Sequence, residues 1–520
     1  MITLCQEGMG KLRVWSVALA VFGMGFICCF VTTGRFGIGL TPDSATYLSQ
    51  ADNLSSGHGL IDYSGCFTAH YPPGYAVFLS CVSVVTGRDI RHGAPRLVCA
   101  FSLSATFVAS LGWLYFRRVR GLSLAAGMVA LVFHPSLLEY GICALSDCLF
   151  VAAIACSLCC LELWCQRCDG IWFCIAVACS AIGLMTRYAG IVWPVCCATA
   201  LLLQSGKSWR SSAGDAGLFL LGSITPLLMW FAGVRFVSGG GAPRSIAFHP
   251  ASAEVLREGV GVICGSLGLQ GHDWSVLVPL MIFSVGCLLS AMLQGFKKCS
   301  VAGGGPSSTL TVRVIGLYLI GYPMFLLLSI TFLDRATPLD GRILLSCVWS
   351  LVLLFTWLVH IGLRDKRVCE VGCWMLIVWF GTRGLVDTVP RLAAWRENGY
   401  GVACAEVLYE TNLKFVREVV PPVTRVYSNV SWSVWLACRR RVFQLDSRHD
   451  YTSGRENAGF EAGLQNVISE VKRGEAIVVL DRLFADPMVL TPTVEDFQNA
   501  GLRERSDEGR SRFVVFDRAK

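Results

Sequence analysis

Residues 14–33 read VWSVALAVFGMGFICCFVTT, an apolar run that directly follows Lys11 and Arg13. About 20 apolar residues are needed for a helix to cross the hydrocarbon core of a bilayer, so this run is long enough to do so. It lacks the small-x-small pattern of a cleavage site, which favours an uncleaved first span over a signal peptide. The run therefore predicts that the chain enters a membrane near its amino terminus.

Similar apolar runs recur along most of the chain. A run at 171–203 is too long for one crossing and is interrupted by Thr-Arg-Tyr at 186–188, so we divide it into two spans joined by a tight turn. With these two, we expect eleven spans; the others lie near 14–33, 96–116, 122–138, 142–165, 214–236, 274–295, 311–333, 342–363 and 368–387. Lys and Arg gather in alternate loops, and the positive-inside rule places those loops in the cytoplasm. The prediction is a polytopic α-helical membrane protein with its amino terminus inside and its polar tail outside.

The distribution of charge divides the chain in two. Only 15% of the 520 residues are charged, against about 25% in soluble proteins. Residues 1–389 hold 43 charged side chains, and the much shorter stretch 390–520 holds 37. We therefore predict a transmembrane domain at 1–389 and an extracytoplasmic domain at 390–520. The net charge of +8 belongs to the first part, because the tail has 19 basic and 18 acidic residues, so no nucleic-acid partner is expected.

The tail has the pattern of a small α/β domain. Short runs rich in β-branched and aromatic residues predict four strands, and residues 458–472 suit a helix between two of them; the strands are expected at 424–429, 441–446, 476–481 and 512–517. Alternating strands and helices favour a partly parallel sheet. We interpret this domain as a structural or acceptor-binding cap, with a direct part in chemistry as the alternative.

The outer loop at 34–95 contains the most informative polar residues. In TPDSATY, at 41–47, Thr41 as N-cap and Pro42 at the first helical position predict a helix start that places Asp43 in the first turn. Asp43 is either a favourable residue for a helix start or a carboxylate that accepts a proton or helps to hold a metal. Tyr47 lies one turn later on the same face. We place the active site in this loop.

A second motif in the loop is HYPPGY at 70–75. Two prolines and a glycine suit a stiff re-entrant or surface-lying segment better than a full span, and His70 and Tyr71 stand immediately before it as candidate substrate contacts.

Three ionisable residues fall near the outer ends of predicted spans: Asp147, Arg187 and Arg342. Charges at such depths are costly and usually face a cavity or a partner. The arginines either reach lipid headgroups as anchors or form a cationic cradle for a lipid phosphate, which their planar forks bind in a bidentate manner. All three are candidates for substrate binding.

The outer loop at 238–273 begins with a glycine run, followed by Arg244 and His249. These two side chains are further candidates for substrate contact, although such a run is commonly a hinge and a lone histidine beside a proline is commonly structural. The one compact cysteine pair, Cys165 and Cys168, has no second pair at finger spacing, so no metal residues are predicted. The first loop has no adjacent acidic pair, which leaves a divalent metal as an open alternative.

Five motifs, taken in their order along the chain, resemble those of the GT-C superfamily of membrane glycosyltransferases. The resemblance is to the bacterial branch related to protein O-mannosyltransferases and the lipid A aminoarabinose transferase. They are PDSATY (42–47), YPPGY (71–75), LSDCLF (145–150), MTRYAG (185–190) and GRILL (341–345). The resemblance covers most of residues 1–350. Many relatives have Glu where Asp147 stands.

The resemblance implies transfer of a sugar from a polyprenyl-phosphate donor to a lipid, glycan or protein acceptor at the outer face of a bacterial inner membrane. Asp43 would be the catalytic carboxylate, and Arg187 and Arg342 would contact the donor phosphate. The alternatives are a transporter or flippase of a lipid-linked or small polar solute, and a non-catalytic envelope scaffold. Convergence of Asp43, Arg187, Arg244 and Arg342 in one outer cavity would favour transfer.

Overall fold

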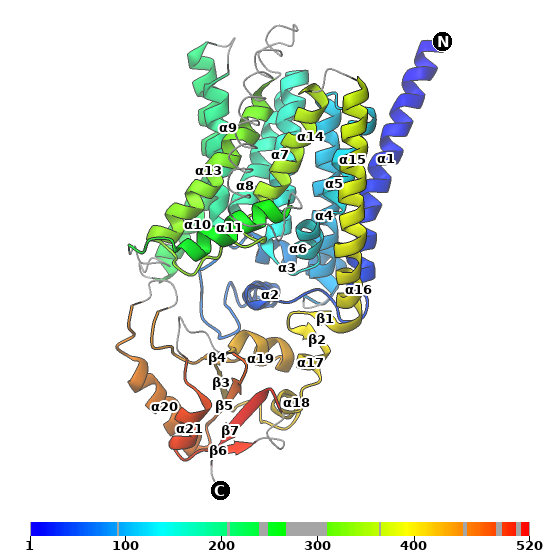
Figure 1. Ribbon diagram of the computed structural model, residues 1–520. Helices are drawn as coiled ribbons and strands as arrows, with labels where there is room; N and C mark the ends of the chain where they lie inside the picture. Colours follow the sequence, from blue (N-terminus) through cyan, green and yellow to red (C-terminus); the bar gives the residue numbers. More distant parts are fainter. Residues whose placement is uncertain are drawn as a thin grey trace.

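The computed structural model has a helical bundle stacked on a mixed α/β region, with the two chain ends at opposite ends of the molecule (Figure 1). It describes residues 2–90, 93–204, 208–238, 248–266, 309–362, 366–450, 455–484, 491–505 and 511–518. The predicted span at 274–295 and Arg244 lie outside these residues.

The bundle is built from apolar helices of different lengths. They are α1 (Ile2–Thr32), α4 (Gly93–Phe116), α5 (Gly121–Val132), α6 (Pro135–Gly141), α7 (Ser146–Arg167), α8 (Gly170–Thr186), α9 (Val192–Leu202), α10 (Trp209–Ser238), α13 (Leu310–Phe332), α14 (Leu345–Gly362) and α15 (Lys366–Arg383). Hydrogen bonds fix neighbouring helices: Ser104 of α4 donates to the carbonyl oxygen of Phe22 in α1 at 2.7 Å. The outside of the bundle stays apolar, as Leu218, Leu221 and Met229 show with exposed fractions of 64–70%.

Within the described residues, α1, α4, α7, α10 and α13 are long and apolar enough to cross a membrane, and the bent pair α5 and α6 makes a sixth candidate. Of the eleven predicted spans, the described residues therefore support five or six. The predicted span at 122–138 is two helices that meet at 49°, because Pro135 begins α6. The run at 171–203 does divide, into α8, a short 3-10 turn (Tyr188–Ile191) and α9. The chain is an integral membrane protein with apolar spanning helices.

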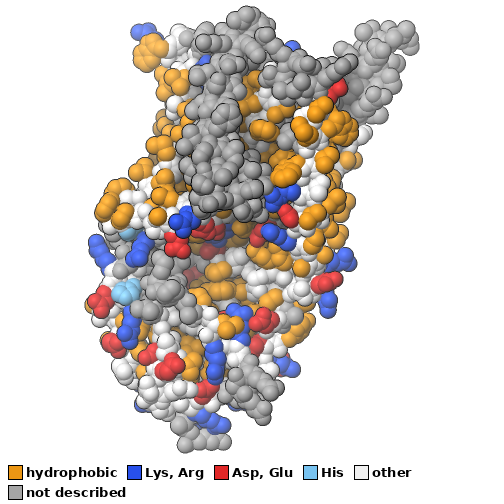
Figure 2. Space-filling model, viewed as in Figure 1, with side chains coloured by type: hydrophobic (Ala, Val, Ile, Leu, Met, Phe, Trp, Pro, Cys, Tyr) orange, Lys and Arg blue, Asp and Glu red, His pale blue; other side chains and the backbone are white. Residues whose placement is uncertain are grey.

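Shorter helices lie at or near the end of the bundle that faces the C-terminal region (Figure 1). They are α2 (Pro42–Ser55), α3 (Gly74–Thr86), α11 (Ala253–Ser266) and α16 (Val389–Asn398). The segment predicted to be re-entrant or surface-lying is α3, whose 13 residues are too few to cross a bilayer. In the face that Figure 2 shows, charged side chains gather at this level and below it, whereas hydrophobic side chains predominate on the described part of the bundle.

The C-terminal region contains a five-stranded sheet in the order β4-β3-β5-β7-β6. Its strands are β3 (Arg425–Ser428), β4 (Phe443–Gln444), β5 (Ala476–Asp481), β6 (Arg503–Arg505) and β7 (Phe513–Asp517). Strands β4, β3 and β5 are parallel, whereas β7 and β6 are antiparallel, which confirms a partly parallel sheet. The predicted helix is α20 (Phe460–Arg473). The remaining elements are β1 (Gly399–Tyr400), β2 (Ala403–Cys404), α17 (Ala405–Leu408), α18 (Thr411–Glu418), α19 (Ser431–Cys438) and α21 (Val494–Asn499).

The C-terminal region is joined to the outer loop by one continuous apolar core. Tyr47 and Leu48 of α2 belong to the same buried cluster as Val434 and Trp435 of α19. The backbone N–H of Val402 donates to the carbonyl oxygen of Leu40 at 2.9 Å. The loop that leads into α2 is therefore held by residues more than 350 positions away.

Candidate active site

The start of α2 is held from two sides and capped locally. Gly39 donates to the carbonyl oxygen of Ile142, and its own carbonyl accepts from Ala144, both at 2.9 Å. Thr41 and Ser44 then form a capping box, as the Thr-Pro-Asp-Ser sequence favours. The segment before Asp43 therefore runs beside the segment before Ser146, and this brings the first turns of α2 and α7 together.

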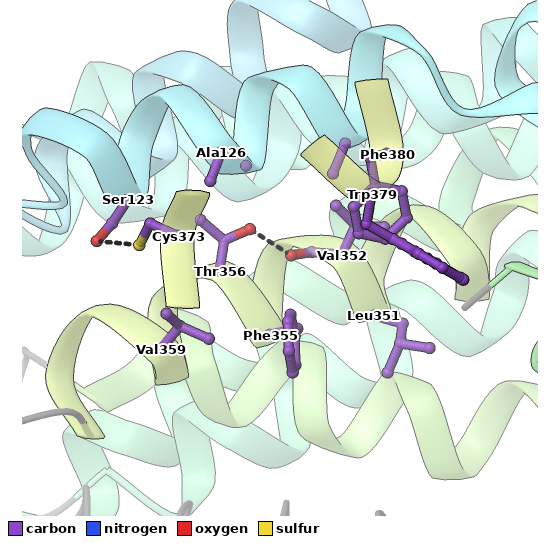
Figure 3. Close-up of a pocket in the computed structure, with 12 residues that line it drawn as sticks. Ser123, Ala126, Leu351, Val352, Phe355, Thr356, Val359, Cys373, Trp379 and Phe380 are labelled. Carbon is purple, nitrogen blue, oxygen red and sulfur yellow. Dashed lines mark hydrogen bonds between the residues drawn. The ribbon is translucent and has the colours of Figure 1, made fainter. Parts of the chain in front are cut away.

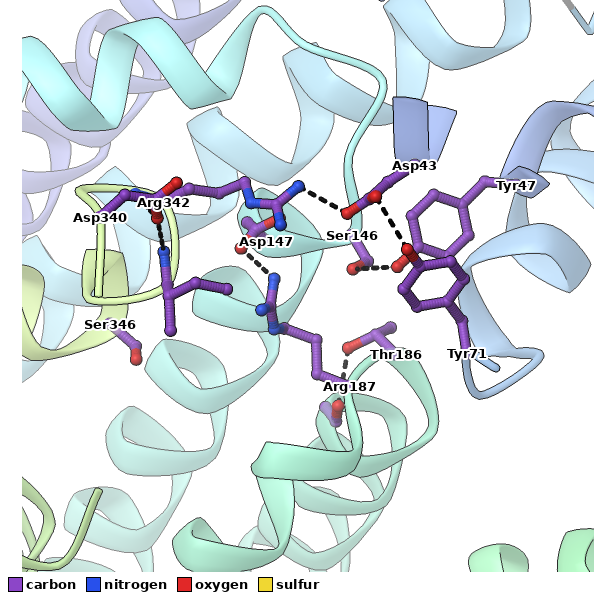
Figure 4. A network of polar contacts seen from close by, with 12 residues as sticks. Asp43, Tyr47, Tyr71, Ser146, Asp147, Thr186, Arg187, Asp340, Arg342 and Ser346 are labelled. Carbon is purple, nitrogen blue, oxygen red and sulfur yellow. Dashed lines mark hydrogen bonds and ion pairs between the residues drawn. The ribbon is translucent and has the colours of Figure 1, made fainter. Parts of the chain in front are cut away.

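Four of the predicted residues form a compact cluster of two carboxylates and two arginines (Figure 4). Nη1 of Arg342 donates to Oδ2 of Asp43 at 2.5 Å. Arg187, which follows α8, donates to Asp147 in the first turn of α7. The Asp43 and Arg342 side chains keep 22% and 20% of their surface exposed, whereas Asp147 and Arg187 keep 4% and 15%. One pair is thus nearly enclosed, and the other faces partly outward.

Tyrosines line the Asp43 side of this cluster. The Tyr71 hydroxyl donates to Oδ1 of Asp43 at 2.8 Å. The Tyr47 hydroxyl shares a 3.0 Å hydrogen bond with Ser146, and its ring lies 4.8 Å from that of Tyr71. The His70 ring meets the Tyr71 ring edge-on at 4.5 Å. The two motifs of the outer loop therefore converge on one carboxylate.

The electrostatic environment keeps Asp43 ionised at neutral pH. Burial raises the pKa of the Asp43 carboxyl, but the Arg342 guanidinium and the hydrogen bond from Tyr71 outweigh burial and hold this pKa below its ordinary value. Burial and the nearby Asp43 carboxylate raise the pKa of Tyr71 well above its ordinary value. Tyr71 therefore remains a hydrogen-bond donor while Asp43 carries the negative charge.

Two further residues support the cluster, although the sequence patterns did not single them out. Oδ1 of Asp340 accepts the backbone N–H groups of Arg342 at 3.0 Å and Ile343 at 2.9 Å, which fixes the turn before α14. The Tyr188 hydroxyl donates to the carbonyl oxygen of Ala69 at 2.9 Å and so ties the residue after Arg187 to the loop before His70. The sequence did contain a signal for Asp340, because an Asp-Gly pair that begins two residues before Arg342 is typical of such a turn.

Other predicted site residues stand apart from this cluster. The backbone N–H of His249 donates to the carbonyl oxygen of Thr331 at 2.9 Å, near the end of α13. Within the described ranges, no hydrogen bond or ion pair joins His249 to Asp43, Asp147 or the two arginines. The same ranges contain no group of three or more His, Cys, Asp or Glu side chains that could hold a metal ion.

A separate pocket of about 250 Å³ lies between α5, α14 and α15 (Figure 3). Its few polar side chains bond one another or the backbone: Ser123 contacts the Cys373 sulfur at 3.4 Å, and Thr356 donates to the carbonyl oxygen of Val352 at 2.7 Å. The rest of the lining is apolar. This pocket therefore suits hydrocarbon rather than a polar solute.

Comparisons with protein-family models and with curated proteins give no match. Solved structures do match. ArnT from Cupriavidus metallidurans bound to undecaprenyl phosphate has a TM-score of 0.58 at 14% identity, over 97% of each chain. The archaeal oligosaccharyltransferase AglB from Archaeoglobus fulgidus, in complex with an inhibitory peptide and a dolichol-phosphate, has a TM-score of 0.55 at 10% identity, over 98% of this chain and 75% of the other. Over nearly its whole length, the chain therefore shares the fold of these two solved structures.

Proposed function

We propose that this protein transfers a sugar from a polyprenyl-phosphate donor to an acceptor at the end of the bundle that carries Asp43. The observation that carries the proposal is the convergence of Asp43, Asp147, Arg187 and Arg342, which come from four segments of the chain. A scaffold has no need of two half-buried arginines beside a carboxylate at a helix start. Convergence is the arrangement expected of a transferase.

The donor class rests on the likeness of fold and on the charge of the cluster. The ArnT structure holds undecaprenyl phosphate, and the AglB structure holds a dolichol-phosphate. Both ligands are polyprenyl phosphates, and a phosphate oxyanion is the group that arginine forks bind best. A polyprenyl tail can remain in lipid beside the bundle while Arg187 and Arg342 hold the phosphate.

The reaction requires a base and stabilisation of a leaving phosphate. An acceptor hydroxyl attacks C1 of the sugar, Asp43 accepts the hydroxyl proton, and the bond between C1 and the phosphate oxygen breaks with its electron pair passing to the phosphate. The arginines stabilise the charge that develops there. Acceptors of the lipid, glycan and protein classes all offer a nucleophile that suits this scheme.

The location of the reaction follows from the distribution of charge. The tail and the Asp43 cluster lie at one end of the bundle, whereas α4 and α7 end beside Arg117, Arg118 and Arg167 at the other (Figure 1). By the positive-inside rule, we infer that the arginine-rich end faces the cytoplasm and the site faces the outer side of the membrane. The family resemblance implies that this membrane is a bacterial inner membrane.

The direct test is transfer from radiolabelled polyprenyl-phosphate sugars by the purified protein in lipid nanodiscs. We expect Asp43→Asn to reduce transfer by at least a factor of 100, because general-base catalysis typically contributes that much. Asp52→Asn is the matched control, since it removes the same charge from the same helix. An Asp43→Asn protein that transfers sugar at the rate of the control would exclude Asp43 as the base.

A parallel reaction with EDTA, followed by addition of Mn²⁺, tests for a metal at Asp43. Activity that is lost with EDTA and restored by the ion would assign Asp43 to metal binding instead of proton transfer.

A further inference from the structure

The two groups that the proposed reaction needs most are bound to each other. Asp43 must accept a proton and Arg342 must bind the phosphate, yet Nη1 of Arg342 donates to Oδ2 of Asp43 at 2.5 Å. A carboxylate in a close ion pair is a weakened base, and an arginine so engaged offers fewer donors to a phosphate. The pairing therefore describes a state of the site that must change in the course of the transfer reaction.

The two ion pairs differ in how readily they can change. Asp147 is 4% exposed and sits in the first turn of a spanning helix, so separating it from Arg187 would leave a charge in a dry environment. In the other ion pair, the side chains of Asp43 and Arg342 are each about one-fifth exposed. Asp340 fixes only the backbone of Arg342, which leaves the long side chain able to swing. The ion pair of Asp43 and Arg342 is therefore the one that can exchange partners.

On the basis of the proposed function, we propose that Arg342 passes from the Asp43 carboxylate to the donor phosphate in the same step in which Asp43 takes the acceptor proton. The Arg187 pair with Asp147 stays intact. The bond from C1 to the acceptor oxygen forms, the bond from C1 to the phosphate oxygen breaks with its electron pair, and the hydroxyl proton ends on Asp43.

Charge conservation within the cluster supports this exchange. Two carboxylates and two guanidinium groups sum to zero. A phosphodiester donor adds one negative charge, and the departing phosphate monoester carries two when fully ionised. Protonation of Asp43 removes one negative charge at the moment when the phosphate gains one. The enclosed site therefore keeps the same net charge through the reaction, and Arg342 loses its attraction to Asp43 as its attraction to the phosphate increases.

We call this passage of Arg342 from Asp43 to the donor phosphate the exchange. It makes a prediction that a simple binding role for Asp43 does not. Asp43→Asn should bind polyprenyl phosphate about tenfold more tightly than the wild type, because Arg342 no longer has a carboxylate to leave. Asp52→Asn removes one negative charge from the same helix and should change the affinity by less than twofold. The double variant Asp43→Asn with Arg342→Gln should bind no more tightly than Arg342→Gln alone.

The experiment measures the binding of undecaprenyl phosphate to each variant in nanodiscs by calorimetry, with thermal unfolding as a check that each variant is folded. Equal or weaker binding by Asp43→Asn overturns the exchange, as does a gain that persists without Arg342. If Asp43→Asn is unfolded, Asp43→Ser replaces it. Absence of any binding to the wild type overturns both the exchange and the proposed function, whereas binding without the gain overturns the exchange alone.

Discussion

The bundle has buried or half-buried carboxylates at both of its ends, and their surroundings differ. At one end, Asp43 and Asp147 each bond an arginine. At the other end lies Glu162, about 24 Å along α7 from Ser146 at 1.5 Å per residue. The Glu162 side chain is 3% exposed. It accepts hydrogen bonds from Thr311 at 2.5 Å and Gln166 at 2.9 Å, and Arg117 lies 3.6 Å away.

This difference in surroundings fits a structural role for the Glu162 cluster and the chemical role that we propose for the Asp43 cluster. Glu162 is surrounded by partners that tie together α4, α7 and α13, and burial leaves little access for a ligand. The Asp43 pair is less enclosed and is built from loop segments and helix starts. Polar groups within a membrane need partners in either case. The partial exposure of the Asp43 pair, together with an arginine that can rebind, supports our proposal that this cluster carries out the chemistry.

The largest expected effect comes from breaking the enclosed ion pair between Asp147 and Arg187. Arg187→Gln should lower transfer by about 10³-fold, since it removes a cation that stabilises the leaving phosphate. It also leaves Asp147 buried without its partner and should lower the apparent Tm.

The double variant Asp147→Asn with Arg187→Gln separates the two effects. We expect the Tm to recover while transfer remains low, as measured by thermal unfolding and by radiolabelled transfer. Recovery of both the Tm and transfer would mean that the Asp147–Arg187 pair has only a structural role, like the Glu162 cluster at the other end of the bundle.

A smaller effect is expected from Tyr71→Phe. Loss of the hydrogen bond to Asp43 should lower transfer by about tenfold. That bond holds the pKa of Asp43 down, so its loss should raise this pKa and shift the acid limb of the pH-rate profile to higher pH. A limb that moves to lower pH, or not at all, would argue against Asp43 as the titrating base.

At the opposite end, Glu162→Gln should affect stability and leave transfer within about twofold of the wild type. Weakening one buried hydrogen-bond cluster in a membrane protein is expected to lower the apparent Tm by roughly 3 °C. Glu461→Gln, whose side chain is 73% exposed, is the control and should leave the Tm unchanged. A large loss of transfer in a stable Glu162→Gln protein would erase the distinction between the clusters.

The smallest effect concerns acid stability. The folded pKa of Asp43 lies below its unfolded value of about 3.9, so its pairing stabilises the protein above that pH and ceases to do so as pH falls through the folded pKa. Between pH 5 and about pH 3, the Tm of the wild type should therefore fall more than that of Asp43→Asn. Parallel curves from thermal unfolding in the same buffers would contradict this.

Local patterns were enough to predict several features of the site and fold. Thr41 and Pro42 predicted the start of α2 and the place of Asp43 in its first turn, because capping depends on adjacent residues. The polar break at 186–188 predicted the end of α8. In the tail, the fully buried strand β5 followed from its run of β-branched residues.

Features that depend on packing between distant segments were not predicted. Glu162 is a single acid in an apolar run, and its need for Arg117 and Thr311 appears only when three helices meet. The bend between α5 and α6 also went unpredicted, although Pro135 was its signal.

The amino-acid sequence by itself determined that this is a membrane protein with a mixed α/β tail and a carboxylate at a helix start, because hydropathy, strand propensity and capping act over short ranges. Only the tertiary structure decided which arginine pairs with which aspartate. Asp43 and Arg342 are 299 residues apart, and they meet because the loop before Asp43 is held between residues 142–144 and 400–402. Such contacts arise from the packing of the whole chain, and no local pattern encodes them.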